Sequence, residues 1–428
     1  MGTTHLGPGG ATPTVPRPEA GHAAPQRLVL ILGAVVLLGP LTVNLYLPAL
    51  PEIETDLRTS AAAVQLTLTG TLLGLAVGQL VVGPLSDALG RRRPLIAGTL
   101  FHVATSLLCM VAPSIGVLGV LRVVQGFGAS ATAVAAMAIV RDLYTGRANA
   151  LLLSRLMLVL GVAPMLAPSV GGAVLGWTSW RGVFGALALA GVAVTVLAIV
   201  ALPETLPRSR RRSGSPGQIM SAYVLLSRDR TFVGLILVGS FSAASTWAYI
   251  SGSSFVMQDQ FGLSEQAFGA VFGAGAAFLV AGTQLSAWLL RRWTPVQILL
   301  RALAGATTAS AVLLAVALAD VGGLPALLVP LWVALGFAGT AMPNAPALAL
   351  SRHGEAAGTA AALVGATRFG VGAAAAPFVG ILGNDAAAMA TVFVVGMSLA
   401  FASMLVVRRS ASVDHELDVT TMDPTPGA

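Results

Sequence analysis

The sequence predicts an all-α membrane protein with twelve transmembrane helices in two six-helix halves. It is 56% hydrophobic and only 10% charged, with a mean hydropathy of +0.84, whereas the surface of a soluble domain needs more charge. Apolar runs of about 20 residues, long enough to cross a bilayer as a helix, recur along the whole chain. They fall at 28–48, 63–84, 94–112, 115–140, 149–175, 182–202, 231–256, 264–290, 296–318, 324–350, 356–382 and 386–407.

Polar segments between these runs predict five parts. The first run follows a segment rich in proline and glycine and is too long for the h-region of a signal peptide, so we expect an uncleaved helix after a disordered tail. The longest polar interruption separates two halves. The parts are an N-terminal tail at 1–26, a first half at 27–202, a cytoplasmic linker at 203–230, a second half at 231–409 and a C-terminal tail at 410–428.

The two halves carry a weak internal repeat. Leu290 to Pro295 (LRRWTP) stands in the second half where a copy of Leu89 to Pro94 (LGRRRP) is expected in the first. Parallel repeats of this kind are typical of transporters whose binding site lies between the halves.

The placement of charge predicts the orientation in the membrane. All basic residues are arginine, which excludes a Walker A lysine and a built-in ATP-driven motor. Most arginines flank the same set of connections and the termini, so the positive-inside rule puts both termini in the cytoplasm of a multi-pass cell-membrane protein. This topology explains the pI of about 10.8 without a nucleic-acid partner. The opposite side carries Arg58 and Arg181 with Glu52, Glu54, Asp56, Asp259, Glu265, Asp320 and Asp385.

The stretch from Gly83 to Pro94 (GPLSDALGRRRP) is the most specific motif. Gly83 and Gly90 are expected to allow a tight cytoplasmic turn, and Pro94 to begin the next helix. The pattern resembles the signature loop between helices 2 and 3 of the major facilitator superfamily. The resemblance implies a charge cluster that latches the outward-facing state, with a cytoplasmic gate formed by Gly83, Asp87, Gly90, Arg91, Arg92, Arg141 and Asp142.

The fifth run has helix-bending residues on one face, at steps of three and four. Two prolines there remove backbone hydrogen bonds and bend the helix. The pattern resembles the helix-5 motif of the superfamily's exporters, although Ala167 stands where many members have glycine. The motif residues are Gly161, Pro164, Pro168, Gly171 and Gly172.

Three further segments resemble the Bcr/CflA subfamily of drug-resistance exporters: Asn44 to Pro51, Val140 to Asp142, and Trp180 to Phe184. The resemblance covers most of 27–409 and implies proton antiport of small antibiotics such as phenicols, bicyclomycin or sulfonamides by alternating access. The sequence departs from the subfamily at Asn44, where aspartate is usual, and at Arg368, where glutamine is commoner.

Two arginines, Arg122 and Arg368, are expected inside the bilayer without an acid at similar depth. Unpaired charges are costly there, so we expect both to face a wet cavity that suits neutral, polar or anionic compounds. For Arg368 a contact between helices is an equally open interpretation, and single aromatics often pack or anchor at interfaces. The candidate cavity residues are Asn44, Tyr46, Arg122, Gln125, Tyr249, Asn344 and Arg368.

Proton coupling has three candidates because Asn44 replaces the usual acid. These are His102, Arg122 and Asp142, and a hydrogen-bonded packing role is the better interpretation of His102. Glycines spaced by four, at Gly70, Gly74 and Gly78 and at Gly269 and Gly273, predict close helix contacts that are either static or sliding.

No motif for catalysis or metal binding occurs, so we expect no enzyme activity, cofactor or metal. The single cysteine, Cys109, permits no intrachain disulfide. The sequence therefore predicts a monomeric exporter of a small drug, with protons and the lipid bilayer as its other partners. A nutrient importer on the same fold and a non-transporting membrane sensor stay open as alternatives.

Overall fold

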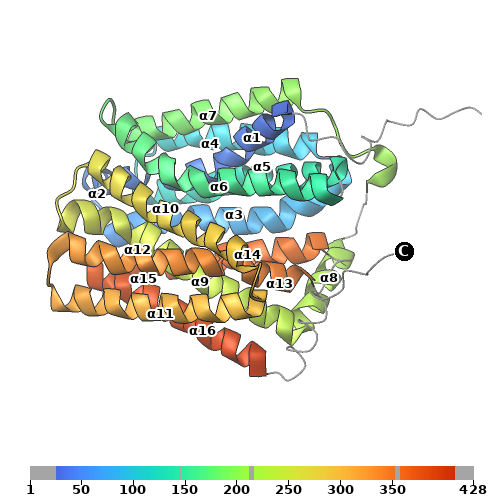
Figure 1. Cartoon of the computed structure of the whole chain (residues 1–428). Helices are drawn as coiled ribbons and strands as arrows, with labels where there is room; N and C mark the ends of the chain where they lie inside the picture. The colour runs from blue at the N-terminus through green and yellow to red at the C-terminus, as the bar shows by residue number, and fades with distance from the viewer. Residues whose placement is uncertain (1–25, 145, 212–215, 352–356, 410–428) are drawn as a thin grey trace, which may run out of the picture.

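The computed structural model describes residues 26–144, 146–211, 216–351 and 357–409, and in these ranges it contains helices and no strand (Figure 1). The predicted N- and C-terminal tails therefore lie outside the described residues, apart from Gln26. The helices of the first half are α1 (Gln26–Asn44), η1 (Leu47–Ala49), α2 (Leu50–Asp56), α3 (Ala61–Leu89), α4 (Arg92–Met110), α5 (Ile115–Leu143), α6 (Gly146–Leu175) and α7 (Trp180–Ala201).

The segment between the halves contains η2 (Arg208–Arg210) and α8 (Pro216–Arg228). The second half consists of α9 (Arg230–Phe255), η3 (Val256–Gln260), α10 (Glu265–Leu289), α11 (Pro295–Ala319), α12 (Gly323–Ala341), α13 (Asn344–Ser351), α14 (Ala357–Ala375), α15 (Pro377–Ile381) and α16 (Ala386–Arg409).

The membrane-spanning segments agree with the predicted fold class. Among the described residues, eleven helical segments are long and apolar enough to cross a membrane. The predicted fifth span corresponds to α6, Gly146–Leu175, in which Val159–Leu175 is a shorter apolar stretch. Several helices begin at a serine or threonine whose side chain accepts a backbone N–H, as Ser60 does for α3 and Ser114 for α5; this satisfies donors that a helix start leaves free.

The structure differs from the sequence analysis at Gly83. We expected Gly83 in the turn after the second span, but α3 continues through Gly83 and Pro84 to Leu89. The helix accommodates Pro84 as an internal residue, and a Cβ added at Gly83 would meet nothing within 4 Å. The turn itself is therefore confined to Gly90 and Arg91.

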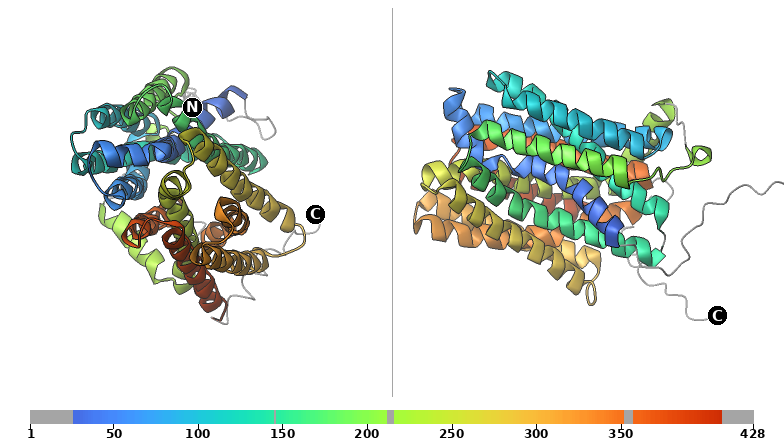
Figure 2. Two further views of the ribbon diagram at one scale, coloured as in Figure 1. Left: turned by 90° about the vertical axis from the view of Figure 1, so that its left-hand side faces the viewer. Right: turned by 90° about the horizontal axis from the view of Figure 1, so that it is seen from above.

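The two halves lie side by side with their helices nearly along a common axis (Figures 1 and 2). Contacts between them follow two helix pairs, α3 with α14 and α6 with α10. We call the end of the bundle that carries Arg91, Arg291 and Arg409 the basic end. The opposite end, which carries Glu52, Asp259, Glu265, Asp320 and Asp385, is the acidic end.

Small residues let helices approach closely at two kinds of interface. Gly74 of α3 and Gly126 of α5 leave no room for a side chain, because an added Cβ would overlap Val123 O and Thr71 O respectively. The stripe of Gly70, Gly74 and Gly78 thus packs within the first half. In contrast, Gly273 of α10 faces α6 of the other half, with Met165 O 3.0 Å from an added Cβ.

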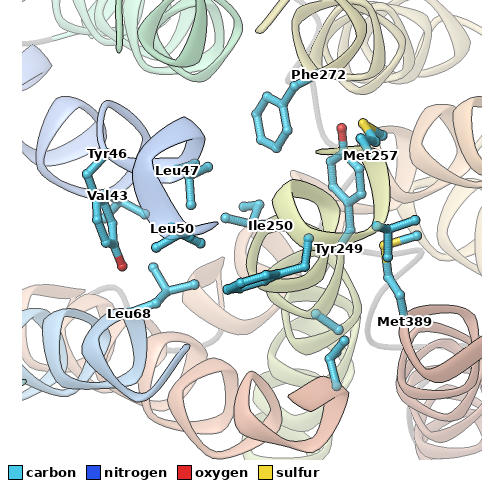
Figure 3. Close-up of a cluster of buried hydrophobic side chains, with 14 of the residues drawn as sticks. Val43, Tyr46, Leu47, Leu50, Leu68, Tyr249, Ile250, Met257, Phe272 and Met389 are labelled. Carbon is cyan, nitrogen blue, oxygen red and sulfur yellow. The ribbon is translucent and has the colours of Figure 1, made fainter. Parts of the chain in front are cut away.

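Hydrogen bonds between the halves are concentrated at the acidic end. In the described ranges five join side chains of one half to the other: Gln65 Nε2 to Ser251 O (3.3 Å) and to Asn384 Oδ1 (2.5 Å), Ser254 Oγ to Leu47 O (2.7 Å), Gln258 Nε2 to Pro48 O (3.2 Å), and Gln266 Nε2 to Gly172 O (3.3 Å). Leu47, Leu50 and Ile250 belong to one buried apolar cluster that spans both halves there (Figure 3). The acidic end is therefore closed in this structure.

Candidate functional site

A charge cluster occupies the basic end of the first half, at the turn between α3 and α4. Arg91 is only 8% exposed and forms ion pairs with Asp87, one helical turn earlier, and with Asp142 at the end of α5. Its Nε–Asp142 Oδ2 distance is 2.7 Å. Asp142 also accepts a hydrogen bond from Thr205 Oγ1 at 3.2 Å. The cluster therefore holds α3, α4 and α5 together at this end.

The predicted gate residue Arg141 does not take part in the cluster, and its side chain is exposed. Arg92 instead donates from Nη2 to Ile199 O of α7 at 2.5 Å. Gly90 has φ of +95° and lies so close to Glu204 that a Cβ would overlap its carboxylate. The positive φ favours glycine at this position, and a larger residue would also displace the Glu204 carboxylate.

Glu204 is a member of this cluster that the sequence analysis missed. Its carboxylate accepts the backbone N–H of Arg91 (2.9 Å) and of Arg92 (3.4 Å), at the start of α4, and forms an ion pair with Arg211. Burial disfavours its charged form, but the backbone donors of Leu206, Arg91 and Arg92 and the charge of Arg211 outweigh burial and hold the pKa of Glu204 below its usual range. The only sequence signal was an acid directly after the sixth span.

Arg122 of α5 lies enclosed within the first half, which differs from the expectation that it faces a wet cavity. It is 0% exposed, and its guanidinium stacks over the ring of Tyr46, 4.0 Å from the centroid, with Phe184 at 5.5 Å. Nη1 donates to Gln125 Oε1 at 2.5 Å and Nη2 to Thr42 O at 2.9 Å. The aromatic faces and two oxygen acceptors compensate much of the charge in place of an acid, while Nε is buried without a hydrogen-bond partner among the described residues.

The predicted residues Tyr46, Gln125 and His102 belong to the same network. Gln125 Nε2 donates to Ser106 Oγ (2.7 Å), whose hydroxyl donates to His102 O (2.7 Å). The Thr42 hydroxyl donates to Leu38 O, so its oxygen accepts from His102 Nε2, 2.8 Å away. We call this set the Arg122 network: Thr42, Tyr46, His102, Ser106, Arg122, Gln125 and Phe184.

Asn44 lies near the Arg122 network on α1 but outside its hydrogen bonds. Its Nδ2 donates to Pro40 O at 2.9 Å, while its Oδ1 is buried and has no partner among the described residues. Asn44 thus places an amide, which does not titrate, where the Bcr/CflA subfamily usually has an aspartate. The contribution of Thr42 and Ser106 could not be read from the sequence, because these residue types are common in apolar helices.

A cavity lies in the second half between α9, α12, α13 and α14. Arg368 of α14 lines it, together with Ser240, Ser242 and Thr246 of α9 and an apolar wall that includes Met342 and Pro346. Ser240, Ser242 and Thr246 are also residues that the sequence analysis did not single out. We call this space the Arg368 cavity.

The other predicted cavity residues lie elsewhere. Tyr249 is buried and stacks on Phe272, with ring centroids 5.1 Å apart. Asn344 donates from Nδ2 to Ser286 Oγ and Thr340 O, at 2.8 Å each, and so joins α13 to α10 and α12. Both side chains are used in packing, and of the predicted set Arg368 alone lines the cavity described here.

The helix-5 motif lies at the contact between the halves. A Cβ at Gly171 would overlap Leu45 O, and one at Gly172 would lie 2.8 Å from Glu265 O of α10. Gly161 faces Val280 of α10, and Pro164 and Pro168 lie in the interior of α6. The motif thus brings α6 against both η1 and the second half.

The chain matches the family model of the Major Facilitator Superfamily over residues 32–377. It belongs to this superfamily. The predicted twelve-helix fold and the resemblance to drug-resistance transporters are confirmed by this match and by the relatives described next.

Three curated relatives align over most of the chain. An "Uncharacterized MFS-type transporter YdgK" of Bacillus subtilis is 38% identical over 383 residues, 87% of this chain and 94% of the relative. A "Bicyclomycin resistance protein homolog" of Haemophilus influenzae is 31% identical, covering 84% and 90%. A "Chloramphenicol resistance protein" of Pseudomonas aeruginosa is 34% identical, covering 78% and 79%.

Solved structures share the fold at low sequence identity. A point mutant of the nucleoside transporter NupG superposes with a TM-score of 0.70 at 12% identity, covering 89% of this chain and 99% of that chain. A D-xylose–proton symporter gives 0.69 at 15% identity, covering 89% and 97%. The protein is thus a multi-pass membrane transporter of the major facilitator fold.

Proposed function

We propose that the protein exports small antibiotics or related drugs from the cytoplasm by proton antiport and alternating access. The single observation that carries this proposal is kinship over most of the chain with two relatives named for bicyclomycin and chloramphenicol resistance, at 31% and 34% identity. The substrates are neutral or anionic compounds of that size, such as phenicols or bicyclomycin.

The geometry supports a rocking motion of the two halves. Their hydrogen bonds lie at the acidic end, while Gly172, Gly269 and Gly273 give α6 and α10 a smooth backbone contact. We assign the basic end to the cytoplasm by the positive-inside rule, so both termini are cytoplasmic and the structure is closed on the external side. Opening requires that the five hydrogen bonds at the acidic end break.

The charge cluster supports a gate in the first half. The ion pairs of Arg91 with Asp87 and Asp142 hold the cytoplasmic ends of α3, α4 and α5 as one unit. In the outward-facing state, we propose that this unit closes against the second half. Arg141, exposed at the same end, then becomes available to that contact.

Proton coupling is assigned to the Arg122 network. His102 and Arg122, two of the three candidates, are joined through Thr42, whose hydroxyl contacts His102 and whose carbonyl oxygen accepts from Arg122. The third candidate, Asp142, is held by Arg91 in the charge cluster. A proton that changes the hydrogen bonds of His102 would therefore act directly on the position of α1 against α5.

The test is antibiotic susceptibility in a bacterial host that lacks its own pumps. We expect the protein to raise resistance to at least one phenicol or bicyclomycin-type drug, and Arg122→Ala to abolish it at equal membrane levels. Arg301→Ala is the matched control, because Arg301 lies exposed at the basic end of α11 beside Trp293. Drug accumulation in place of depletion would indicate import and contradict the proposal.

Coupling is tested in everted vesicles energised by a pH gradient. Drug addition should release protons in the presence of the wild-type protein. We expect His102→Gln to remove drug-dependent proton release and Asp142→Asn to retain part of it. The reverse result would move the coupling site to the charge cluster.

A further inference from the structure

The Arg368 cavity contains a positive charge that the described protein does not compensate. Arg368 lies near the middle of the membrane-spanning segment Gly358–Ile381. Its polar contact is with the sulfur of Met342, 3.7 Å from Nη2, and a thioether is only a weak acceptor. In the part of the chain that the structure describes, no carboxylate forms an ion pair with it. An intramembrane charge without a partner is expensive and points to a ligand.

A second, independent observation comes from α9, which lines the same cavity. Ser240 of α9 is 1% exposed, lines the same cavity, and its hydroxyl has no hydrogen-bond partner among the described residues. A buried hydroxyl without a partner is costly, and serines in helices commonly donate to the preceding turn. Ser240 therefore keeps a free donor at the cavity that contains Arg368.

In the part of the second half that the structure describes, no acid lies near the middle of a membrane-spanning helix, where Arg368 stands. The acids described there, Asp259, Glu265, Asp320 and Asp385, lie at or near the ends of the helices. Arg122 in the first half provides a comparison, because two oxygen acceptors and two aromatic rings surround its positive charge. Arg368 lacks such a set, although it stands in the same membrane interior.

We propose that the Arg368 cavity binds the negative group of an amphipathic organic anion, with Arg368 as charge partner and Ser240 as hydrogen-bond donor. Planar guanidinium groups pair well with carboxylates. Met342, Ala345, Pro346 and Val364 supply an apolar wall for the remainder of the ligand. The proposal rests on the proposed export function and deepens it, because it specifies the anionic part of the substrate range as aromatic or aliphatic monoanions.

The test is equilibrium binding of radiolabelled benzoate to the purified full-length protein in detergent, by scintillation proximity. Benzamide is the competitor, since it has the same ring and nearly the same shape but no charge. We expect saturable benzoate binding, at least tenfold weaker competition by benzamide than by unlabelled benzoate, and at least a tenfold loss of benzoate affinity in Arg368→Gln. Arg301→Gln removes one positive charge outside the cavity and should bind within twofold of wild type.

Two conservative variants keep the proposal falsifiable if Arg368→Gln does not fold. Arg368→Lys retains the charge and should retain most of the affinity, and Ser240→Ala should lose about threefold or more. Absence of saturable binding, equal competition by benzamide, or unchanged affinity in Arg368→Gln and Ser240→Ala overturns the proposal.

The two functional proposals fail in different ways. Benzoate binding that depends on Arg368, in a protein that confers no drug resistance, would overturn the export function and leave the anion site standing. Resistance to a neutral drug that survives Arg368→Gln, with no benzoate binding by the wild type, would overturn the anion site and leave export standing.

Discussion

The arginines of the two halves of the bundle differ in their interaction partners. In the first half, Arg91 forms ion pairs with two aspartates, and Arg122 is enclosed by acceptors and aromatic rings. In the second half, Arg291 and Arg292 of the weak repeat are exposed, and Arg368 lines a cavity with a thioether as its polar neighbour. The weak sequence repeat therefore does not place its arginines in the same electrostatic surroundings in the two halves.

This difference separates positive charges that hold the structure together from one for which we propose a ligand. Arg91 and Arg122 each link three helices or their connections, so their loss should disturb the packing. Arg368 lacks a comparable set of described partners. The comparison predicts opposite effects on stability when an arginine is replaced in the first half and when Arg368 is replaced. The following experiments can contradict this prediction.

The largest effect is expected for Arg122→Ala. Its removal leaves Gln125 Oε1 and Thr42 O without their donor, and a buried polar group without a partner costs about 1–3 kcal/mol. We expect a lower melting temperature of the purified protein together with loss of resistance. A variant that melts like wild type would show that the Arg122 network does not stabilise the first half.

Arg368→Met should have the opposite sign. An apolar side chain of similar length removes an uncompensated charge, and such replacements of buried charged groups are neutral or stabilising, here by about 1 kcal/mol. The melting temperature without ligand should stay equal or rise. A clear decrease would show that Arg368 is held by the protein, as Arg122 is.

The neighbours of the two arginines offer a matched pair. Tyr46→Leu removes the ring beneath Arg122 and should cost about 2 kcal/mol, the value of a cation–π contact between buried groups, since both side chains are 0% exposed. Met342→Leu conserves volume beside Arg368 and should change the melting temperature less. Equal losses in the two variants would contradict the contrast between the halves.

The smallest effect concerns Glu204, which caps the start of α4 in the first half. Its pKa is lowered from the ordinary value of 4.5, so its contribution is complete above that pH and is lost as the pH falls through the lowered pKa. Glu204→Gln should cost about 0.5 kcal/mol near pH 7, a typical value for a carboxylate at a helix N-terminus.

Melting curves of wild type and Glu204→Gln at a series of pH values test this expectation. Their difference should be constant between about pH 6 and 7 and shrink below about pH 4.5, where the wild-type carboxylate becomes protonated. A difference that persists at low pH would show that the contacts of Glu204 do not depend on its charge.

Much of the fold could be predicted from the sequence because bilayer thickness fixes the length of each apolar run. The pairing of Asp87 with Arg91 was also within reach, because both lie in one short motif. Glu204 was not, since it meets Arg91 only after the chain has crossed the membrane four more times. Gly83 was misplaced because a glycine–proline pair is typical of a turn, whereas α3 tolerates it inside the helix.

The candidate site could be predicted only in part, because the sequence does not determine how each helix is rotated about its axis. A helix that is apolar on all sides carries no pattern that separates its cavity face from its lipid face. The sequence therefore predicted that Arg122 and Arg368 lie inside the membrane but not that one is enclosed and the other lines a cavity. It likewise could not distinguish Tyr249 and Asn344, which pack, from Ser240.

The closure at the acidic end has a consequence for how this surface tolerates sequence change. Of its five hydrogen bonds, four end on main-chain carbonyl oxygens, those of Leu47, Pro48, Gly172 and Ser251. A main-chain acceptor survives any side-chain replacement that leaves the backbone in place. The strength of these hydrogen bonds therefore depends on the side chains of the few donors, three glutamines and one serine, and not on the side chains of the accepting residues. Gly172 is nevertheless fixed by packing, because an added Cβ would lie 2.8 Å from Glu265 O.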